Sequence, residues 1–99
     1  MNPTITHSSV ALVTGASRGI GAAIATRLAR ERNAVAVNYA SNAQEAQQVV
    51  EAIAAAGGRA IAMQGDVSDP MAVRTLFDAV ERHLGPITVL VNNAGIMPA

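Results

Sequence analysis

Thr14-Gly15-Ala16-Ser17-Arg18-Gly19-Ile20-Gly21 follows the apolar run Val10-Ala11-Leu12-Val13 and leads into a segment with helical spacing of apolar residues. The glycines of this stretch let the backbone turn tightly and approach a ligand without an intervening Cβ. A helix that begins here presents free N–H groups and the positive end of its dipole. The stretch therefore predicts a strand, a tight loop and a helix start that together bind an anion.

The rest of the chain alternates strand-like and helix-like segments. Helical spacing of apolar residues indicates three helices, with apolar positions Ile20, Ala23, Ile24 and Leu28 in the first, Ala46, Val49, Val50 and Ile53 in the second, and a buried stripe of Val73, Leu76, Phe77, Val80 and Leu84 in the third. Short apolar runs indicate four strands, at 10–13, 34–37, 59–63 and 87–91. Strands joined by helical crossovers run parallel. We expect an α/β fold, a truncated Rossmann-type doubly wound parallel sheet with strand order 3-2-1-4.

Capping signals mark the helix ends. The second helix has two overlapping capping boxes, at 41–44 and 42–45, and Gly57-Gly58 follows its last apolar position. The third begins with an N-cap aspartate and a proline at its first position, at 69–70, and Gly85-Pro86 stops it. These signals place the helix boundaries independently of the apolar spacing.

The composition limits the class of protein. The chain has 99 residues, 51% of them apolar, which suits one domain at 10–99 after a flexible segment at 1–9. Seven basic residues balance seven acidic ones, so we expect no nucleic-acid partner, and no apolar run approaches the roughly 20 residues of a membrane span. The absence of cysteine excludes disulfides and the usual zinc clusters, and we expect a cytoplasmic protein without a metal site.

Four loops follow the four expected strands, at 14–21, 38–42, 65–67 and 92–95. Because the carboxyl ends of parallel strands meet at one edge, these loops should line one ligand-binding crevice. The glycine spacing is Gly-x-x-x-Gly-x-Gly, and no Gly-Lys-Ser/Thr follows as in a Walker A loop. A nucleoside triphosphate site is therefore disfavoured.

Two of these loops resemble the motifs of the short-chain dehydrogenase/reductase family. Thr14 to Gly21 matches its cofactor motif Thr-Gly-x-x-x-Gly-x-Gly, and Asn92 to Gly95 matches its Asn-Asn-Ala-Gly motif. The resemblance runs from about Val10 onward and is strongest to the branch of 3-oxoacyl-acyl-carrier-protein reductases and related dehydrogenases. It implies a nicotinamide dinucleotide cofactor, hydride transfer to or from a small carbonyl or alcohol substrate, and a homo-oligomer at full length.

The resemblance also implies which residues contact the cofactor. Asp66 and Val67 match the positions that hold adenine, although Asp66 could instead cap a helix. The positions at 93–95 match residues near the ribose that carries nicotinamide. The complete set of predicted cofactor-binding residues is Gly15, Ser17, Arg18, Gly19, Ile20, Gly21, Asn38, Ala40, Ser41, Asp66, Val67, Asn93, Ala94 and Gly95.

Charge decides which cofactor is expected. A ribose 2′-hydroxyl is best met by a carboxylate after the second strand, whereas a 2′-phosphate is attracted by arginine. The second strand ends without Asp or Glu, and Arg18 lies in the glycine loop. We therefore expect NADP(H) in preference to NAD(H). Ser41 either hydrogen-bonds the 2′-phosphate or caps the second helix, or does both.

The catalytic residues of the family are not expected in this chain. The family uses a Ser and a Tyr-x-x-x-Lys pair, but Tyr39 is the only tyrosine and there is no lysine. Since single α/β domains commonly reach 200 to 250 residues, we expect the cofactor-binding front part of a longer reductase. A short dinucleotide-binding module without catalysis and a protein that assembles through its strand edge are the alternatives.

Overall fold

The computed structural model describes residues 9–94, and the predicted element order βαβαβαβ is confirmed. β2 and β3 continue past the predicted strand ends, because their ladder extends to the pair Tyr39 and Gln64. The expected flexible segment lies, except for Ser9, outside the described residues, as does Gly95. The elements are β1 (Val10–Val13), α1 (Gly19–Arg30), β2 (Ala34–Tyr39), α2 (Ala43–Ala55), β3 (Arg59–Gln64), α3 (Pro70–Leu84) and β4 (Ile87–Val91).

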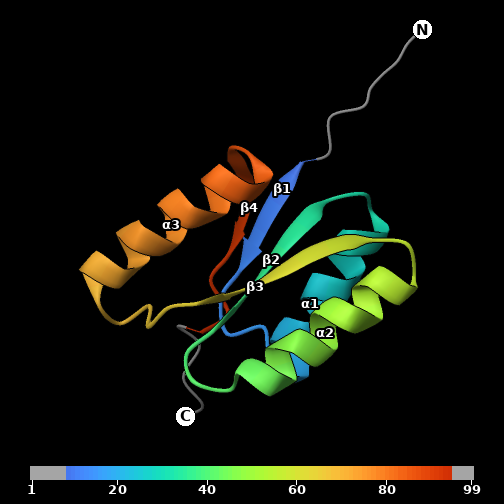
Figure 1. Cartoon of the computed structure of the whole chain (residues 1–99), viewed down its shortest axis with the longest axis horizontal. Coiled ribbons are helices and arrows are strands. Elements are labelled where there is room, and N and C mark those ends of the chain that lie inside the picture. The colour runs from blue at the N-terminus through green and yellow to red at the C-terminus, as the bar shows by residue number, and fades with distance from the viewer. Residues whose placement is uncertain (1–8, 95–99) are drawn as a thin grey trace, which may run out of the picture.

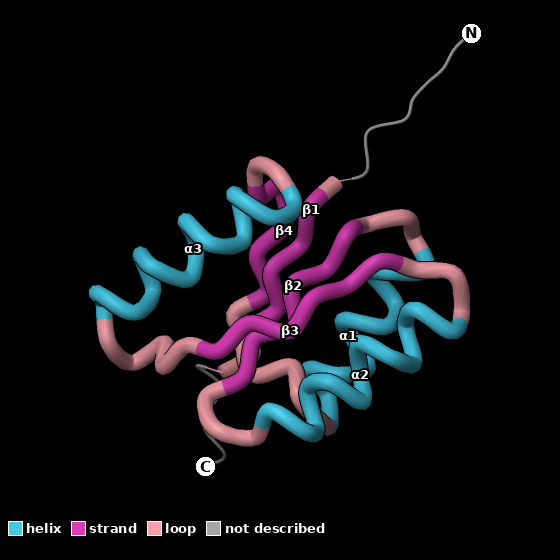
Figure 2. Tube along the Cα trace, in the orientation of Figure 1, coloured by secondary structure: helices cyan, strands magenta, loops and turns pink. Residues whose placement is uncertain are grey.

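All four strands form one parallel sheet in the order β3-β2-β1-β4, as predicted. Figure 1 shows α1 and α2 side by side on one face of the sheet and α3 alone on the other. Figure 2 shows the strands as a central layer between these helices. The carboxyl ends of the strands therefore share one edge, where the predicted ligand loops gather.

Alternate residues of the central strands enter two separate cores. Ala11, Val13, Val35 and Val37 face α1 and α2, whereas Val10, Leu12 and Ala36 face α3. All seven are almost fully buried. Strands buried on both faces have near-continuous apolar sequences, which is why β1 and β2 show no alternation.

The apolar spacing of α1 does not describe its buried face. The buried residues are Gly21, Ala25 and Ala29, while Ile20 is 71% exposed. Ile24 and Leu28 pack only at the margin of the core. Small residues face the sheet because they let the helix backbone approach it closely.

The predicted buried stripe of α3 is correct only in part. Leu76 and Val80 are buried, whereas Val73, Phe77 and Leu84 are partly exposed. The reason is that α3 is the only described helix on its face of the sheet, so no neighbouring helix covers its flanks.

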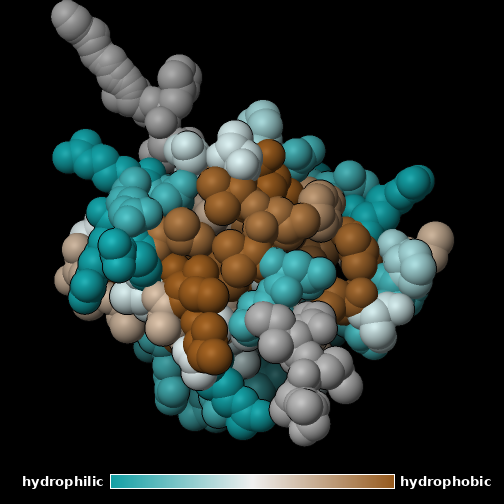
Figure 3. All heavy atoms as spheres, turned by 180° about the vertical axis from the view of Figure 1, so that it is seen from behind, coloured by the Kyte–Doolittle hydropathy of each residue, from teal (hydrophilic) through white to brown (hydrophobic). Residues whose placement is uncertain are grey.

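β4 forms one edge of the sheet and is only half covered. Its register against β1 shifts between Val10 and Ala11, and the extra residue Thr88 bonds the Val10 N–H and carbonyl through its hydroxyl at 3.2 and 3.3 Å. Leu90 on this strand is 52% exposed. Seen from behind, the molecule carries a broad apolar area (Figure 3), and β4 lies toward that side. This edge strand therefore carries exposed apolar surface.

Candidate functional site

The glycine loop between β1 and α1 needs its three glycines for two reasons, backbone conformation and close contact. Gly15 and Gly19 both have a φ of +61°, a left-handed conformation that side chains rarely adopt. A Cβ on Gly21 would collide with the carbonyl oxygen of Gly15 and lie 2.7 Å from Nδ2 of Asn93. A Cβ on Gly19 would meet nothing within 4 Å. The loop is thus closed on its inner side and open in front of Gly19.

The N-terminus of α1 is the uncapped one among the described helices. Asn42 caps α2 by accepting the Glu45 N–H at 3.0 Å, and Asp69 caps α3 by accepting the Met71 N–H at 3.0 Å. Arg18 occupies the N-cap position of α1 without a side-chain cap bond, and the first turn holds no acidic residue. Unsatisfied N–H groups at a helix start favour an anion. The residues present therefore fit a diphosphate.

The two motifs found in the sequence bond directly to each other. The Thr14 hydroxyl accepts the Ala94 N–H at 3.1 Å and donates to Oδ1 of Asn92 at 3.2 Å. The Asn93 amide donates to the Gly15 carbonyl at 3.0 Å. Thr14 is only 4% exposed, so its hydroxyl lies beneath the exposed residues Asn92 and Ala94. The loop after β4 is therefore held against the glycine loop although about 80 residues separate them in the sequence.

Asn38 links three strand ends from beneath the site. Its side chain is 2% exposed, accepts the Gly15 N–H at 3.2 Å, and donates to the carbonyls of Met63 and Gly65 at 3.2 Å each. Its own carbonyl accepts the Ala16 N–H at 2.8 Å. The predicted cofactor contact of Asn38 therefore cannot involve its amide without breaking these bonds, and the structure makes it a positioning residue.

A hollow of about 330 Å³ lies where the glycine loop meets the end of β2. Five predicted site residues line it together with three that the sequence reasoning missed: Tyr39, Asn42 and Glu45. A signal for Glu45 exists, because it stands three residues after the N-cap of α2, where side chains turn back toward the helix start. The five predicted residues are Gly15, Ser17, Arg18, Ala40 and Ser41.

The structure resolves the two capping ambiguities left open by the sequence. Asn42 is the N-cap of α2, so the capping role considered for Ser41 is wrong, and Ser41 lies exposed in the hollow. Asp69 is the N-cap of α3, so the capping role considered for Asp66 is also wrong. Both residues lie exposed at the carboxyl end of the sheet, where a ligand can reach them.

Asp66 forms a local turn on the far side of the site. Its Oδ1 accepts the hydroxyl of Ser68 at 2.6 Å and the Ser68 N–H at 3.0 Å. These hydrogen bonds, that of the hydroxyl first, lower the pKa of the Asp66 carboxyl from its ordinary value. The carboxylate is thus ionised at neutral pH and able to accept from an amine. Val67 beside it is half-buried against the core under α3.

The remaining predicted residues lie at the rim of the site. Ile20 is exposed on the first turn of α1, and Ala94 is exposed beside Gly15. Within residues 9–94, no three His, Cys, Asp or Glu side chains gather to hold a metal ion. The described helices are all too short or too polar to cross a membrane.

Comparisons with known proteins show which family the chain resembles. A family model described as short chain dehydrogenase matches residues 9–99. An uncharacterized oxidoreductase of Methylorubrum extorquens is 58% identical over 90 residues, which make up 91% of this chain and 36% of that protein. The reductase FabG of Staphylococcus aureus, which acts on 3-oxoacyl-acyl-carrier protein by its name, is 51% identical over 86 residues, 87% of this chain and 35% of its own.

Solved structures show the same likeness. A short chain dehydrogenase from Burkholderia cenocepacia, crystallised in complex with NADP, matches with a TM-score of 0.84 and 55% identity. The match covers 92% of this chain and 37% of that one. The chain thus spans about a third of the length of the curated relatives it matches.

Proposed function

This chain belongs to the short chain dehydrogenase family, and from that premise we propose that it is the NADP(H)-binding portion of an oxidoreductase. The observation that carries the proposal is the uncapped start of α1 behind an open glycine loop, beside a hollow lined by Arg18 and Ser41. Helix starts of this kind bind phosphates. A bound nicotinamide would donate a hydride to a carbonyl substrate or accept one from an alcohol substrate. That substrate, a homo-oligomeric state and a cytoplasmic location remain predictions.

The chain's own residues divide the work of holding the cofactor. The first turn of α1 takes the diphosphate, and Arg18 and Ser41 take the 2′-phosphate in the hollow. Asp66 accepts from the exocyclic amine of adenine, beside Val67. Asn38 contributes from below, because its hydrogen bonds fix the glycine loop and the segment before Asp66 in relation to each other.

The hollow holds one group that attracts a 2′-phosphate and one that repels it. The exposed Arg18 supplies a guanidinium, and it forms no ion pair within the described residues. The end of β2 carries no carboxylate, yet Glu45 reaches the same hollow from α2. The NADP complex of the Burkholderia cenocepacia relative supports the same preference. We therefore propose that Arg18 sets the cofactor preference and that Glu45 weakens it.

Binding of NADPH and NADH to two charge variants tests this assignment. Arg18→Glu removes a charge-assisted bond and adds repulsion, so we expect NADPH affinity to fall about 100-fold and the affinity for NADH, which lacks the 2′-phosphate, to fall much less. Glu45→Gln removes repulsion and should tighten NADPH alone. Arg27→Glu is the matched control, because Arg27 lies on the same helix paired with Glu31, away from the hollow. Equal losses for both cofactors in Arg18→Glu would contradict the 2′-phosphate assignment.

A second measurement addresses cofactor binding as such. We expect the folded chain with its natural sequence to bind NADPH. The backbone amide signals of Gly15 and Gly19 should shift in NMR spectra when NADPH is added. A folded chain with no response to either cofactor would overturn the proposal. It would favour assembly through the half-covered edge of β4 instead.

A further inference from the structure

A second hollow lies at the amino ends of the parallel strands, where β2 and β3 begin. It measures about 510 Å³ and lies between the turn that ends α1 and the turn that ends α2. None of its lining residues is acidic, and three of them are arginines, out of seven basic residues in the whole chain. The lining residues are Ala29, Arg30, Arg32, Asn33, Ala34, Ala56, Gly57, Gly58 and Arg59.

The two turns beside this hollow have the same hydrogen bonds but different residues at the critical position. After α1, Arg32 donates to the Ala29 carbonyl and Asn33 to the Leu28 carbonyl, both at 3.1 Å. After α2, the equivalent two bonds measure 3.0 and 2.9 Å. This Schellman motif requires a left-handed residue, normally glycine. Gly57 fills that position after α2 with a φ of 88°, whereas Arg32 fills it after α1 with a φ of 70°.

An arginine in the left-handed conformation is strained, and Arg32 is the only non-glycine residue with positive φ in the described chain. Helix stability alone therefore favours glycine at this position, as Gly57 illustrates. Strain retained at a site that also gathers charge indicates a role for the side chain.

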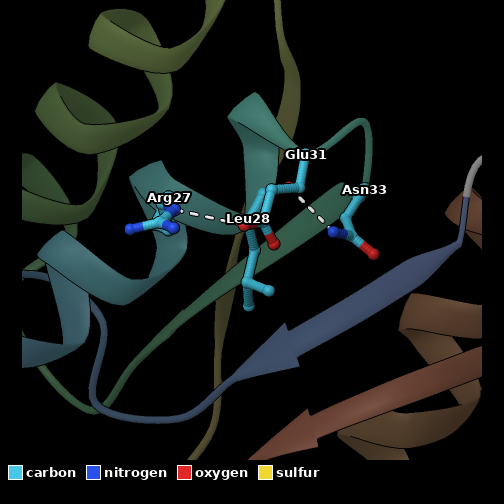
Figure 4. A network of polar contacts seen from close by, with 4 residues as sticks. All are labelled: Arg27, Leu28, Glu31 and Asn33. Atoms are coloured by element: carbon cyan, nitrogen blue, oxygen red, sulfur yellow. Dashed lines mark hydrogen bonds and ion pairs between the residues drawn. The ribbon is translucent and has the colours of Figure 1, made fainter.

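The surroundings keep this turn rigid and its arginines unpaired. Figure 4 shows the Asn33 amide donating to the Leu28 carbonyl, at 2.8 Å, and Arg27 paired with Glu31 at 3.1 Å. Glu31, the acid next to Arg32 in the sequence, is thus held by another arginine. Arg30 and Arg32 form no ion pair within residues 9–94.

The net charge of the hollow remains positive after the helix dipoles are included. Two helix C-termini contribute roughly −0.5 charge each, against three guanidinium groups. Arg59 donates one bond, to the His83 carbonyl at 3.4 Å, which leaves most of its donors available. An excess of about two positive charges in a concave site suits a ligand with two or more negative charges. One guanidinium group can donate to two phosphate oxygens at once.

We propose that the hollow lined by Arg30, Arg32 and Arg59 is a second anion site, distinct from the nucleotide site and specific for a small, multiply charged phosphate. The two sites lie at opposite ends of the parallel strands. A volume of about 510 Å³ leaves room for an organic group attached to the phosphate.

Titration with inorganic pyrophosphate, followed by amide NMR shifts, tests the proposal. We expect saturable shifts at Asn33, Gly57 and Gly58, read separately from those at the glycine loop of the nucleotide site. Arg32→Gly should weaken the binding at these amides about tenfold. The same variant should raise Tm by about 2–5 °C, because glycine relieves the left-handed strain. A gain in stability with a loss of binding is not expected from a purely structural arginine.

Two further variants complete the test. Arg30→Gln keeps the strained residue and should weaken pyrophosphate binding without raising Tm. Arg74→Gln removes the same charge from α3, on the other face of the sheet, and should leave binding unchanged. Unchanged binding in Arg32→Gly, an equal loss in Arg74→Gln, or the absence of saturable shifts at the three amides would each overturn the proposal.

Discussion

The loops at the two ends of the sheet are held in different ways. At the carboxyl end, side chains of one loop bond the backbone of another, as Asn38 does with Gly15 and Gly65. At the amino end, each turn is closed mainly by bonds to the helix it follows, as Asn33 shows with Leu28. The carboxyl end therefore behaves as one coupled unit, whereas the turns at the amino end are independent of one another.

The two asparagines give the sharpest test of this difference and the largest expected effect. Asn38→Leu keeps the volume but leaves the Gly15 N–H and the Met63 and Gly65 carbonyls without their partner. We expect the free energy of unfolding to fall by about 4 kcal/mol. Denaturant titration measures the loss, and amide hydrogen exchange should accelerate at both Gly15 and Gly65.

The control for this variant is a change in a residue whose side chain bonds a single residue of one neighbouring strand. Thr88→Val removes a hydroxyl that bonds Val10 alone, so its effect should be smaller and confined to the edge strand. If Asn38→Leu accelerated exchange at only one of the two glycines, the carboxyl end would not be a coupled unit.

Gly21→Ala should disrupt the packing between the loops at the carboxyl end of the sheet. The new Cβ would meet the Gly15 carbonyl and the Asn93 amide, both fixed by their own hydrogen bonds. We expect a loss of about 3 kcal/mol in unfolding free energy and no measurable NADPH binding. Gly19→Ala is the matched comparison, because its Cβ meets nothing within 4 Å and only the left-handed backbone is strained, by about 1 kcal/mol. Equal losses in the two variants would rule out close approach as the reason for Gly21.

Asn33→Ala should have the smallest effect, because it acts within one turn. It removes the bond to the Leu28 carbonyl at 2.8 Å, while the backbone bond from residue 33 to the same carbonyl remains. We expect a loss of about 1 kcal/mol, measured by denaturant titration, and an unchanged Kd for NADPH. A weaker NADPH affinity in this variant would show that the two ends of the sheet are coupled after all.

The same difference explains which residues around the hollow the sequence indicated and which it did not. The glycines, Arg18 and Ser41 belong to short motifs whose function depends on backbone conformation and charge within a few residues. Glu45 was missed because it reaches the hollow only through the packing of α2 against the end of β2. The hydrogen bonds of the Asn38 side chain could not be predicted for the same reason, since its partners lie 23 to 27 residues away.

The sequence by itself determined the order of the elements, their boundaries within about two residues and the positions of the glycine turns. These features depend on hydrogen bonds and conformational preferences within one or two helical turns, so local residues suffice to specify them.

Only the tertiary structure decided which face of α1 is buried, which of two capping boxes starts α2, and which loops bond one another. Small residues such as Ala25 and Ala29 were selected over larger apolar ones because the helix packs closely on the sheet. Arg32 belongs here too, since only the observed backbone shows that it stands where glycine would be expected. Each of these outcomes depends on the shape of a neighbouring element, and local sequence carries no record of that shape.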